Sequence, residues 1–290
     1  MEPRVLLAGD LIEPIEIGAV YFEEASGEDT AADVIQITFE GGAPGTQLDQ
    51  LTIETDKVGD GLTIGDVFFD TQPGGEGAFG AVPLSIVDQT GIDSVDVTVV
   101  DGGTTLVLDF TGFDAGETLL FSVDVDEVGF LGSNAVAEGN EFEGSILTAT
   151  FDAPHYYEAT GNDIFLDSYD HRLGTSSLDL PPDDYVPPGT VPHPVRTAGA
   201  IFSLEQTPLP SSISGYVFED GDRDVLRDPG EAGIAGVDLA LYEWDGSQYV
   251  ATGQTTQTDS QGYYFFNVFE PGTYRVVETQ PSGYLSVGAR

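Results

Sequence analysis

The sequence contains no cysteine, which excludes disulfide bonds, thiol catalysis and cysteine-ligated zinc. Basic residues are scarce too, because 8 lysine and arginine residues stand against 51 acidic ones, a formal net charge of −43. Such a chain repels nucleic acid and anionic membranes and attracts divalent cations, so we expect no nucleic-acid partner. No apolar run approaches the roughly 18 residues of a membrane-spanning helix, so we expect no direct membrane insertion.

What the sequence does contain is a repeated β-strand pattern. Runs of β-branched and aromatic residues alternate with polar ones and end at turns rich in Gly, Asp and Asn, and no long stretch keeps a helical period. A hydrophobic content of 40% distinguishes the chain from a disordered acidic tail. The sequence therefore predicts an all-β protein, with a length that suits two domains.

Residues 11–205 are expected to form an acidic β-sandwich or jelly roll that follows an N-terminal segment, residues 1–10. Residues 1–212 carry most of the negative charge, a net −35. A hairpin is predicted around Asp101-Gly-Gly103, and Thr197 to Leu204 is expected to be the closing strand. The remaining expected strands are Ile15 to Glu23, Asp33 to Phe39, Leu48 to Glu54, Asp66 to Asp70, Pro83 to Val87, Thr118 to Val125 and Ser145 to Phe151.

Two proline-rich stretches are predicted to lie outside the sheets. Residues 179–195 hold six prolines and cannot form a central strand, so we expect an extended excursion over the surface. Residues 206–212 are expected to be a linker stiffened by two prolines, leading to a small domain at 213–290.

The small domain contains a stretch with the spacing of a calcium loop. Counted from Asp220, acidic residues occupy positions 1, 3, 5, 9 and 12, from which an EF-hand loop supplies oxygen ligands, and position 7 supplies its carbonyl. A hard cation of this kind takes six to eight oxygens. The predicted Ca²⁺ ligands are Asp220, Asp222, Asp224, Leu226, Asp228 and Glu231.

One position departs from this pattern. Position 6, usually glycine because the loop turns sharply there, is Val225, so the loop is expected either to be re-routed or to bind more weakly. The bland alternative is a solvated acidic turn that binds nothing. Strand-like runs on both sides predict that the ion clips a β-domain and does not open a pair of helices.

The residues around this loop resemble a known family. Ile213-Ser-Gly-Tyr-Val-Phe218, Gly230-Glu-Ala-Gly-Ile234, Thr258-Asp-Ser-Gln-Gly-Tyr263 and Pro271 to Tyr284 are similar to the SdrD B-like repeats of bacterial surface proteins, which are related to Cna-B domains. The resemblance implies a small, calcium-binding, immunoglobulin-like sandwich that serves as a stalk or spacer.

Some Cna-B-like domains carry a Lys–Asn isopeptide bond assisted by an acid. The single lysine of this chain, Lys57, lies far upstream of the small domain, so we expect no such bond there. We expect Glu278, in the position of the acid, to be an ordinary strand residue, and Lys57 to be a solvent-exposed turn residue.

A second calcium site is expected in the large domain. Asp124, Asp126 and Glu127 end a strand, and Asp66 and Asp70 lie near other strand ends, where carboxylates of β-sandwiches often converge on an ion. The alternative is a solvated sheet edge that is kept soluble by its charge.

Catalytic candidates are weak by comparison. His155, His171 and His193 lack a shared spacing for zinc, and no nucleophile motif accompanies the Asp170-His171 pair. Acidic residues are so numerous that no carboxylate pair stands out for glycoside hydrolysis. We therefore expect a protein that is not an enzyme.

The first residues, Met1-Glu-Pro-Arg-Val-Leu-Leu7, resemble the Leu-Glu-Pro-Arg-x-Leu-Leu motif of planctomycete surface and secreted proteins. With the SdrD B-like segment, this predicts a bacterial, extracellular structural protein, a calcium-stabilised building block of a surface layer, stalk or filament. Self-association or contact with neighbouring surface proteins is expected. An adhesin or carbohydrate-binding module is the second interpretation, with glycans as partners, and a secreted hydrolase with accessory domains is the third.

Overall fold

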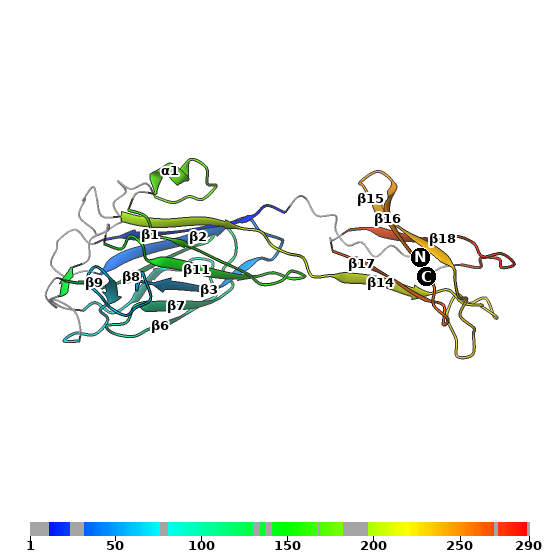
Figure 1. Ribbon diagram of the computed structural model, residues 1–290, viewed down its shortest axis with the longest axis horizontal. Helices are drawn as coiled ribbons and strands as arrows, with labels where there is room; N and C mark the ends of the chain where they lie inside the picture. Colours follow the sequence, from blue (N-terminus) through cyan, green and yellow to red (C-terminus); the bar gives the residue numbers. More distant parts are fainter. Residues whose placement is uncertain are drawn as a thin grey trace. The chain divides into compact units, whose positions relative to one another are not determined.

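The computed structural model describes residues 12–23, 32–75, 81–129, 134–136, 141–167, 169–181, 197–269 and 272–288. Contacts divide the chain into two compact units, with the boundary between Thr207 and Pro208 (Figure 1). The all-β prediction is confirmed, because strands build both units and α1 (Asp170–Leu173) is a single helical turn. Within these ranges, no helix has the length and apolarity to cross a membrane.

Strands β1 to β13 belong to the larger unit. They are β1 (Ile15–Phe22), β2 (Asp33–Glu40), β3 (Gln47–Glu54), β4 (Val67–Phe69), β5 (Ser85–Asp88), β6 (Ser94–Val99), β7 (Thr105–Thr111), β8 (Thr118–Val123), β9 (Val125–Val128), β10 (Asn134–Val136), β11 (Ile146–Asp152), β12 (Ala159–Ile164) and β13 (Thr197–Leu204).

These strands form a sandwich of two five-stranded antiparallel sheets. One has the order β13-β1-β2-β8-β5 and the other β12-β11-β3-β7-β6, while a short sheet, β10-β9-β4, lies at one end (Figure 1). Alternate residues of each strand point into the space between the layers. The Phe39 ring centroid lies there 5.0 Å from that of Phe151 and 5.6 Å from that of Phe113, so aromatic packing fills the core.

The sequence located most of these strands. The predicted hairpin is confirmed, since β6 and β7 pair antiparallel around the turn at 100–104. The closing strand is confirmed as well, because β13 pairs with β1 along its whole length and Gly199 bridges Leu166 beside β12. Strands β9, β10 and β12 were not predicted. β12 reads Ala-Thr-Gly-Asn-Asp-Ile, in which three residues depleted in strands, Gly, Asn and Asp, interrupt the pattern.

A strap, residues 169–181, covers the outer face of β1 and β13. Leu178 and Leu180 pack where Gly18 has no side chain, and the Tyr169 ring lies over Gly199. Glu16 anchors the strap by accepting hydrogen bonds of 2.8 Å from the amide and the hydroxyl of Ser177. β1 is consequently buried on both faces.

The strap bears on the predicted proline-rich excursion at 179–195. Residues 179–181 lie on the sandwich, with Leu180 buried in an apolar cluster and not extended over the surface. Residues 182–195 of the predicted excursion lie outside the described ranges, as does the predicted N-terminal motif at residues 1–10.

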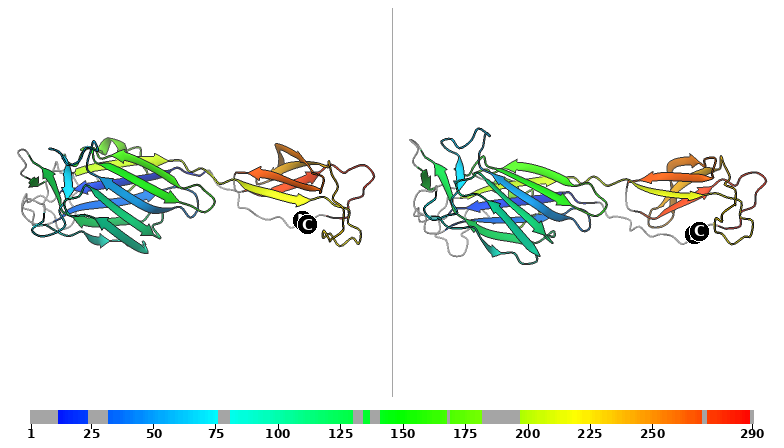
Figure 2. Two further views of the ribbon diagram at one scale, coloured as in Figure 1. Left: turned by 60° about the horizontal axis from the view of Figure 1, so that its bottom comes forward. Right: turned by 90° about the horizontal axis from the view of Figure 1, so that it is seen from below.

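The smaller unit is a sandwich of a two-stranded and a three-stranded sheet (Figure 2). Its core is formed by Leu239, Leu241, Tyr264, Phe266 and Val268. The strands are β14 (Ser211–Tyr216), β15 (Asp238–Trp244), β16 (Tyr249–Gln257), β17 (Tyr263–Val268) and β18 (Tyr274–Glu278), in the orders β14-β17 and β16-β15-β18.

The predicted linker at 206–212 is shorter in the structure. The Gln206 side-chain oxygen accepts a hydrogen bond of 2.6 Å from the Ala43 amide, and the Thr207 carbonyl accepts one of 2.9 Å from Tyr157. β14 already begins at Ser211, so only 208–210 connect the two units.

Candidate metal-binding loops

The predicted calcium loop, residues 220–231, connects β14 to β15 in the smaller unit. Its two ends are held together by a bridge between Phe218 and Gly233 and by a hydrogen bond of 2.8 Å from the Glu219 amide to the Ala232 carbonyl. Strands lie on both sides, as the alternating sequence predicted. The loop is therefore closed by β-pairing and not by a pair of helices.

The carboxylates at positions 1, 3 and 5 are fixed by backbone amides. Asp220 accepts hydrogen bonds from the amides of Arg223 (2.6 Å) and Val225 (3.0 Å). Asp222 accepts one from Asp224 (3.2 Å), and Asp224 accepts one from Leu226 (2.7 Å). These turns bring one oxygen of each of Asp220, Asp222 and Asp224 within 4.8 Å of the others.

The remaining predicted ligands are less concentrated. Glu231 reaches across the loop, where its two oxygens accept hydrogen bonds from the amides of Gly221 (2.8 Å) and Asp228 (3.0 Å). Neither Asp228 nor Glu231 belongs to the group of oxygens within 4.8 Å. The Leu226 side chain is 46% exposed, in accord with a residue whose expected contribution is its carbonyl. Three of the five predicted carboxylates therefore converge.

Val225 keeps the backbone conformation that glycine normally supplies. Its φ is 65°, as is that of Arg223, so both residues are left-handed. The loop is thus not re-routed around the missing glycine. A β-branched residue in this region is destabilised by its own Cβ, on the order of 1–2 kcal/mol.

The clustered carboxylates of the 220–231 loop repel one another. A hydrogen bond from the Asp224 amide favours the charged form of Asp222, but partial desolvation and the charges of Asp224, Asp228 and Asp220 outweigh it and raise the pKa of Asp222. Arg227 does not neutralise these charges, because its guanidinium lies 4.0 Å from the Tyr216 ring centroid and donates to the Gln261 carbonyl. Among the described residues, the one ion pair joins Arg172 to Asp163 in the other unit.

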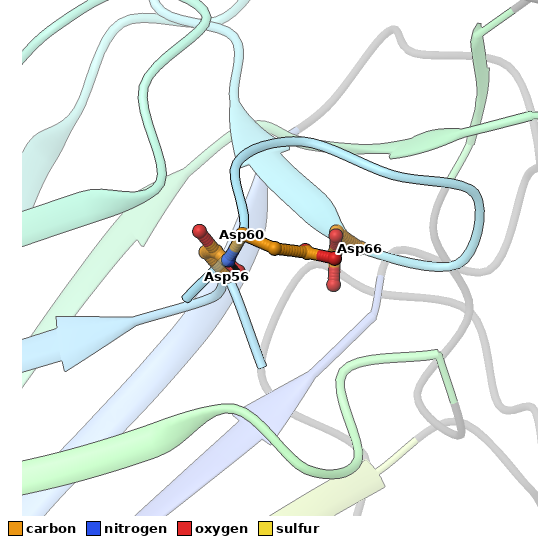
Figure 3. Close-up of side chains that lie close together, drawn as sticks. All are labelled: Asp56, Asp60 and Asp66. Atoms are coloured by element: carbon orange, nitrogen blue, oxygen red, sulfur yellow. Dashed lines mark hydrogen bonds between the residues drawn. The ribbon is translucent and has the colours of Figure 1, made fainter. Parts of the chain in front are cut away.

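A second acidic loop, between β3 and β4, brings together Asp56, Asp60 and Asp66 (Figure 3). Asp56 accepts hydrogen bonds from the amides of Gly61 (2.8 Å) and Gly59 (2.7 Å), and these bonds, that of Gly61 above all, lower its pKa. Asp66 was among the carboxylates expected near strand ends, but a metal-binding loop was not predicted here. Asp56 and Asp60 followed by Gly61 repeat positions 1, 5 and 6 of the EF-hand pattern, a signal that could have found it.

The two loops share one backbone design. In each, the first aspartate accepts hydrogen bonds from the amides three and five residues later, and both of those residues have positive φ. They are Gly59 and Gly61 in one loop and Arg223 and Val225 in the other. The 220–231 loop therefore adopts the same turn with two residues whose Cβ atoms disfavour a positive φ.

Lys57 lies in this second loop, between β3 and β4, and the structure corrects the prediction made for it. It is half-buried and not a solvent-exposed turn residue, since its ammonium donates hydrogen bonds to the carbonyls of Gly65 (2.7 Å) and Glu141 (2.5 Å). Burial lowers its pKa, while Asp66 and neighbouring glutamates oppose that shift. Lys57 thus ties the loop to the segment before β11.

The predicted set Asp124, Asp126 and Glu127 does not come together. Asp124 and Asp126 are buried and two residues apart, whereas Glu127 is half-buried and points to the opposite side of β9, where its charge acts on Lys57. Strand alternation separates them. Neither metal-capable group among the described residues contains a histidine, and His193 lies outside those ranges.

Comparison with known proteins shows which domain family the smaller unit matches. Residues 211–289 match the family model of the SdrD B-like domain, and the match begins at the first residue of β14. These residues are an SdrD B-like domain. The Leu-Glu-Pro-Arg-type motif of residues 1–10 remains a prediction.

The similar curated proteins are much longer than this chain. Serine-aspartate repeat-containing protein D of Staphylococcus aureus (strain Newman) is 30% identical over 178 residues, which cover 56% of this chain and 12% of that protein. Serine-aspartate repeat-containing protein F of Staphylococcus epidermidis is 29% identical over 181 residues, 57% of this chain and 10% of that protein. The chain therefore spans about a tenth of the curated relatives that it matches.

Among solved structures, a variant of the major pilin subunit of Bacillus cereus aligns over 92% of this chain and 59% of its own. The sequence identity is 10% and the TM-score 0.22, too low to indicate a shared arrangement.

Proposed function

We propose that this chain is a non-catalytic, calcium-stabilised structural segment of a bacterial cell-surface protein, in which rigid β-sandwiches space or assemble. The observation that carries the proposal is the convergence of Asp220, Asp222 and Asp224 in an SdrD B-like domain. Calcium would act as a clip that holds the turn between β14 and β15, with Glu231 and Asp228 drawn in to complete the shell.

The donor set suits calcium. Calcium–oxygen distances are about 2.3–2.6 Å, so oxygens on opposite sides of one ion lie about 5 Å apart. The three aspartate oxygens already meet that limit, and every donor is a hard carboxylate or carbonyl oxygen. Desolvation raises the pKa of Asp222, and so does repulsion by Asp224, Asp228 and Asp220, which a cation would relieve.

The short connection between the two units supports a spacer role. Residues 208–210 alone separate Thr207, which is bonded to the larger unit, from β14, and two of these three are proline. Short, proline-containing connections are stiff. With a net charge of −43, copies of the chain repel one another, so divalent cations would favour assembly or contact with neighbouring surface proteins.

The alternative, a glycan-binding adhesin, is favoured by one surface. Tyr216, Tyr263 and Phe265 form a row on the outer face of the β14–β17 sheet, with ring centroids 5.2 Å and 6.4 Å apart. Tyr216 and Phe265 are 47% and 52% exposed. Such a row is a platform on which sugar rings could stack. Glycan-array binding that Phe265→Ser abolishes would favour this alternative.

Calorimetric titration of Ca²⁺ into chelator-stripped protein tests the calcium clip. The Asp56→Asn background is used, so that the loop of the larger unit contributes no heat. We expect binding that Asp220→Asn abolishes and Asp245→Asn leaves intact, because Asp245 accepts similar turn hydrogen bonds outside the cluster. At one hundred times the dissociation constant, calcium should stabilise the unit by about 2.7 kcal/mol. Heat that survives Asp220→Asn would refute the assignment.

A further inference from the structure

The sandwich of the larger unit is closed on one side and open on the other. On the closed side, Gly199 of β13 bridges to Leu166, which lies just after β12. On the other side, β5 and β6 each end a sheet, and within the described ranges β5 pairs with β8 alone and β6 with β7 alone (Figure 1). The open side therefore offers strand edges to which another strand can add.

The hydrophobic core is incompletely covered on this open side. Val97 stands opposite the buried Leu108 in the register of β6 and β7, so its side chain points to the same, inward face, and yet it is 37% exposed. Val95 and Val99 of β6 and Ile86 of β5 also pack against the core but are only partly buried. Val95, Val97 and Val99 thus form a valine row that faces the core from the end of its sheet.

The backbone groups at the free edge of β6 belong to the same valine row. The Thr55 amide donates to the Thr104 carbonyl between β3 and β7, and the direction of hydrogen bonding alternates along an antiparallel strand. Even-numbered residues of β7 therefore bond to β3, and odd-numbered ones bond to β6. Because these odd-numbered residues pair with even-numbered residues of β6, as Val107 does with Thr98, the amides and carbonyls of the valine row point to the open edge.

This edge is complementary to a second copy of itself. When two β6 strands run antiparallel about a two-fold axis at Val97, Val97 pairs with Val97 and Val95 with Val99, and each pair exchanges two backbone hydrogen bonds. Asp96 then faces Thr98 of the second copy, whose hydroxyl can donate to the carboxylate. The valine rows of the two copies join, so each copy covers the open side of the other's core.

Charge excludes the neighbouring registers. The inward face must stay on one side of the joined sheet, so a slip has to preserve the alternation of the strand. A slip in one direction sets Asp96 directly opposite Asp96 of the second copy, and a slip in the other sets the inward-facing Val95 opposite Asp101. Like charges directly opposite one another destabilise a strand pair, and an acidic side chain does not suit the apolar row. The register centred on Val97 avoids both.

We propose that the larger unit self-associates through the β6 edge, as a two-fold dimer in which β6 pairs antiparallel with β6 of a second copy and Val97 lies on the axis. The inference rests on the proposed function, of which assembly is one part, and names the surface and the partner for that assembly. Because the pairing uses backbone groups and valine side chains, it needs no calcium. Added salt should favour it by screening the charges of the two copies.

The absence of cysteine makes the register directly measurable. Val97→Cys places a thiol opposite its equivalent at the Cα separation of about 5.5 Å of a hydrogen-bonded pair, which a disulfide can span. Val95→Cys is the matched control, because its equivalents lie four residues out of register, about 14 Å apart. In chelator at high salt, with diamide as oxidant, we expect a covalent dimer of Val97→Cys and little of Val95→Cys. Equal yields from the two variants would overturn the register.

Sedimentation equilibrium of the 290-residue chain under the same conditions, without oxidant, tests the association itself. Thr98 is exposed on the outer face of β6, so changes there spare the core. Thr98→Lys sets a cation opposite each Asp96 and should tighten the dimer by roughly two- to tenfold, whereas Thr98→Asp should weaken it by a similar factor. Thr160→Lys and Thr160→Asp, on the exposed face of β12 at the opposite edge of the same sheet, are controls for net charge and should change the affinity far less.

The outcomes separate this interface from the calcium clip. A chain that stays monomeric at every concentration, or a dimer that responds to neither change at Thr98, would overturn the β6 interface. Either result would leave the calcium clip standing, because the titration of the 220–231 loop does not depend on association. Conversely, Asp220→Asn should abolish calcium binding by that loop and leave dimerisation in chelator unchanged.

Discussion

Replacing Val225 with glycine and, separately, with alanine tests the left-handed turn of the 220–231 loop. In ordinary backbone conformations, alanine is more stable than glycine by roughly 0.5–1 kcal/mol, because glycine loses more freedom on folding. At a φ of 65° the alanine Cβ costs about 1–2 kcal/mol, which reverses the order. We therefore expect Val225→Gly to be more stable than Val225→Ala by about 0.5–1 kcal/mol.

Comparing the two variants with each other cancels the stability changes that they share. Both lose the valine methyl groups, one of which approaches Gly288 so closely that a Cβ there would lie 3.0 Å away. Leu226, the next residue, does not have positive φ, so Leu226→Ala should be more stable than Leu226→Gly. Denaturant unfolding followed by Trp244 fluorescence measures all four variants, since Trp244 lies in β15 of the same unit. A Val225→Ala variant at least as stable as Val225→Gly would refute the left-handed turn.

Two further predictions concern the same cluster and the strap. Partial desolvation and the charges of the neighbouring aspartates raise the pKa of Asp222, so the folded state is destabilised at pH values above that pKa and this destabilisation is lost as pH falls through it. Asp222→Asn should consequently raise the Trp244 unfolding midpoint in chelator at pH 7 and remove the further rise on adding calcium; a lower midpoint in chelator would contradict this. In Gly18→Ala, the new Cβ would meet Leu180 and approach the Leu178 methyl group to 2.9 Å, an overpacking of about 1–3 kcal/mol. Calorimetry should show a lower melting temperature for the larger unit and no change in the Trp244 transition, whereas Gly174→Ala, with open space around it, should alter neither.

Strands with a clear period were predictable from the sequence, because each buries one face. β7 reads Thr-Leu-Val-Leu-Asp-Phe-Thr, and its second, fourth and sixth residues are buried. β12 was not predicted because Gly161, Asn162 and Asp163 interrupt its pattern, and its place in the sheet is set by its pairing with β11, a distant contact that its own sequence does not reveal. The strap was not predicted for another reason. Leu178 and Leu180 pack on Gly18, some 160 residues away, and no local sequence pattern indicates that contact.

The candidate site was predictable to the extent that it is local. Aspartates that are two residues apart can face the same side of a turn, and Asp220, Asp222 and Asp224 do converge. Asp228 and Glu231 depend on how the second half of the loop folds back, which spacing does not determine. Strand alternation also separates Glu127 from Asp126, although a run of acidic residues conceals this in the sequence.

The conformation at Val225 is maintained by contacts outside the loop. Arg227 stacks on Tyr216, the Tyr284 hydroxyl donates to Glu219 (2.9 Å), and the Val225 side chain packs near Gly288. Because these contacts and the Asp220 hydrogen bonds are made by protein groups alone, we expect the strain to be borne when the domain folds. The valine should then weaken folding and not calcium binding, so Val225→Gly should bind Ca²⁺ within a few-fold of the parent. Binding more than about tenfold tighter, a gain of about 1.4 kcal/mol, would mean that the strain is released in the free loop and restored by the ion.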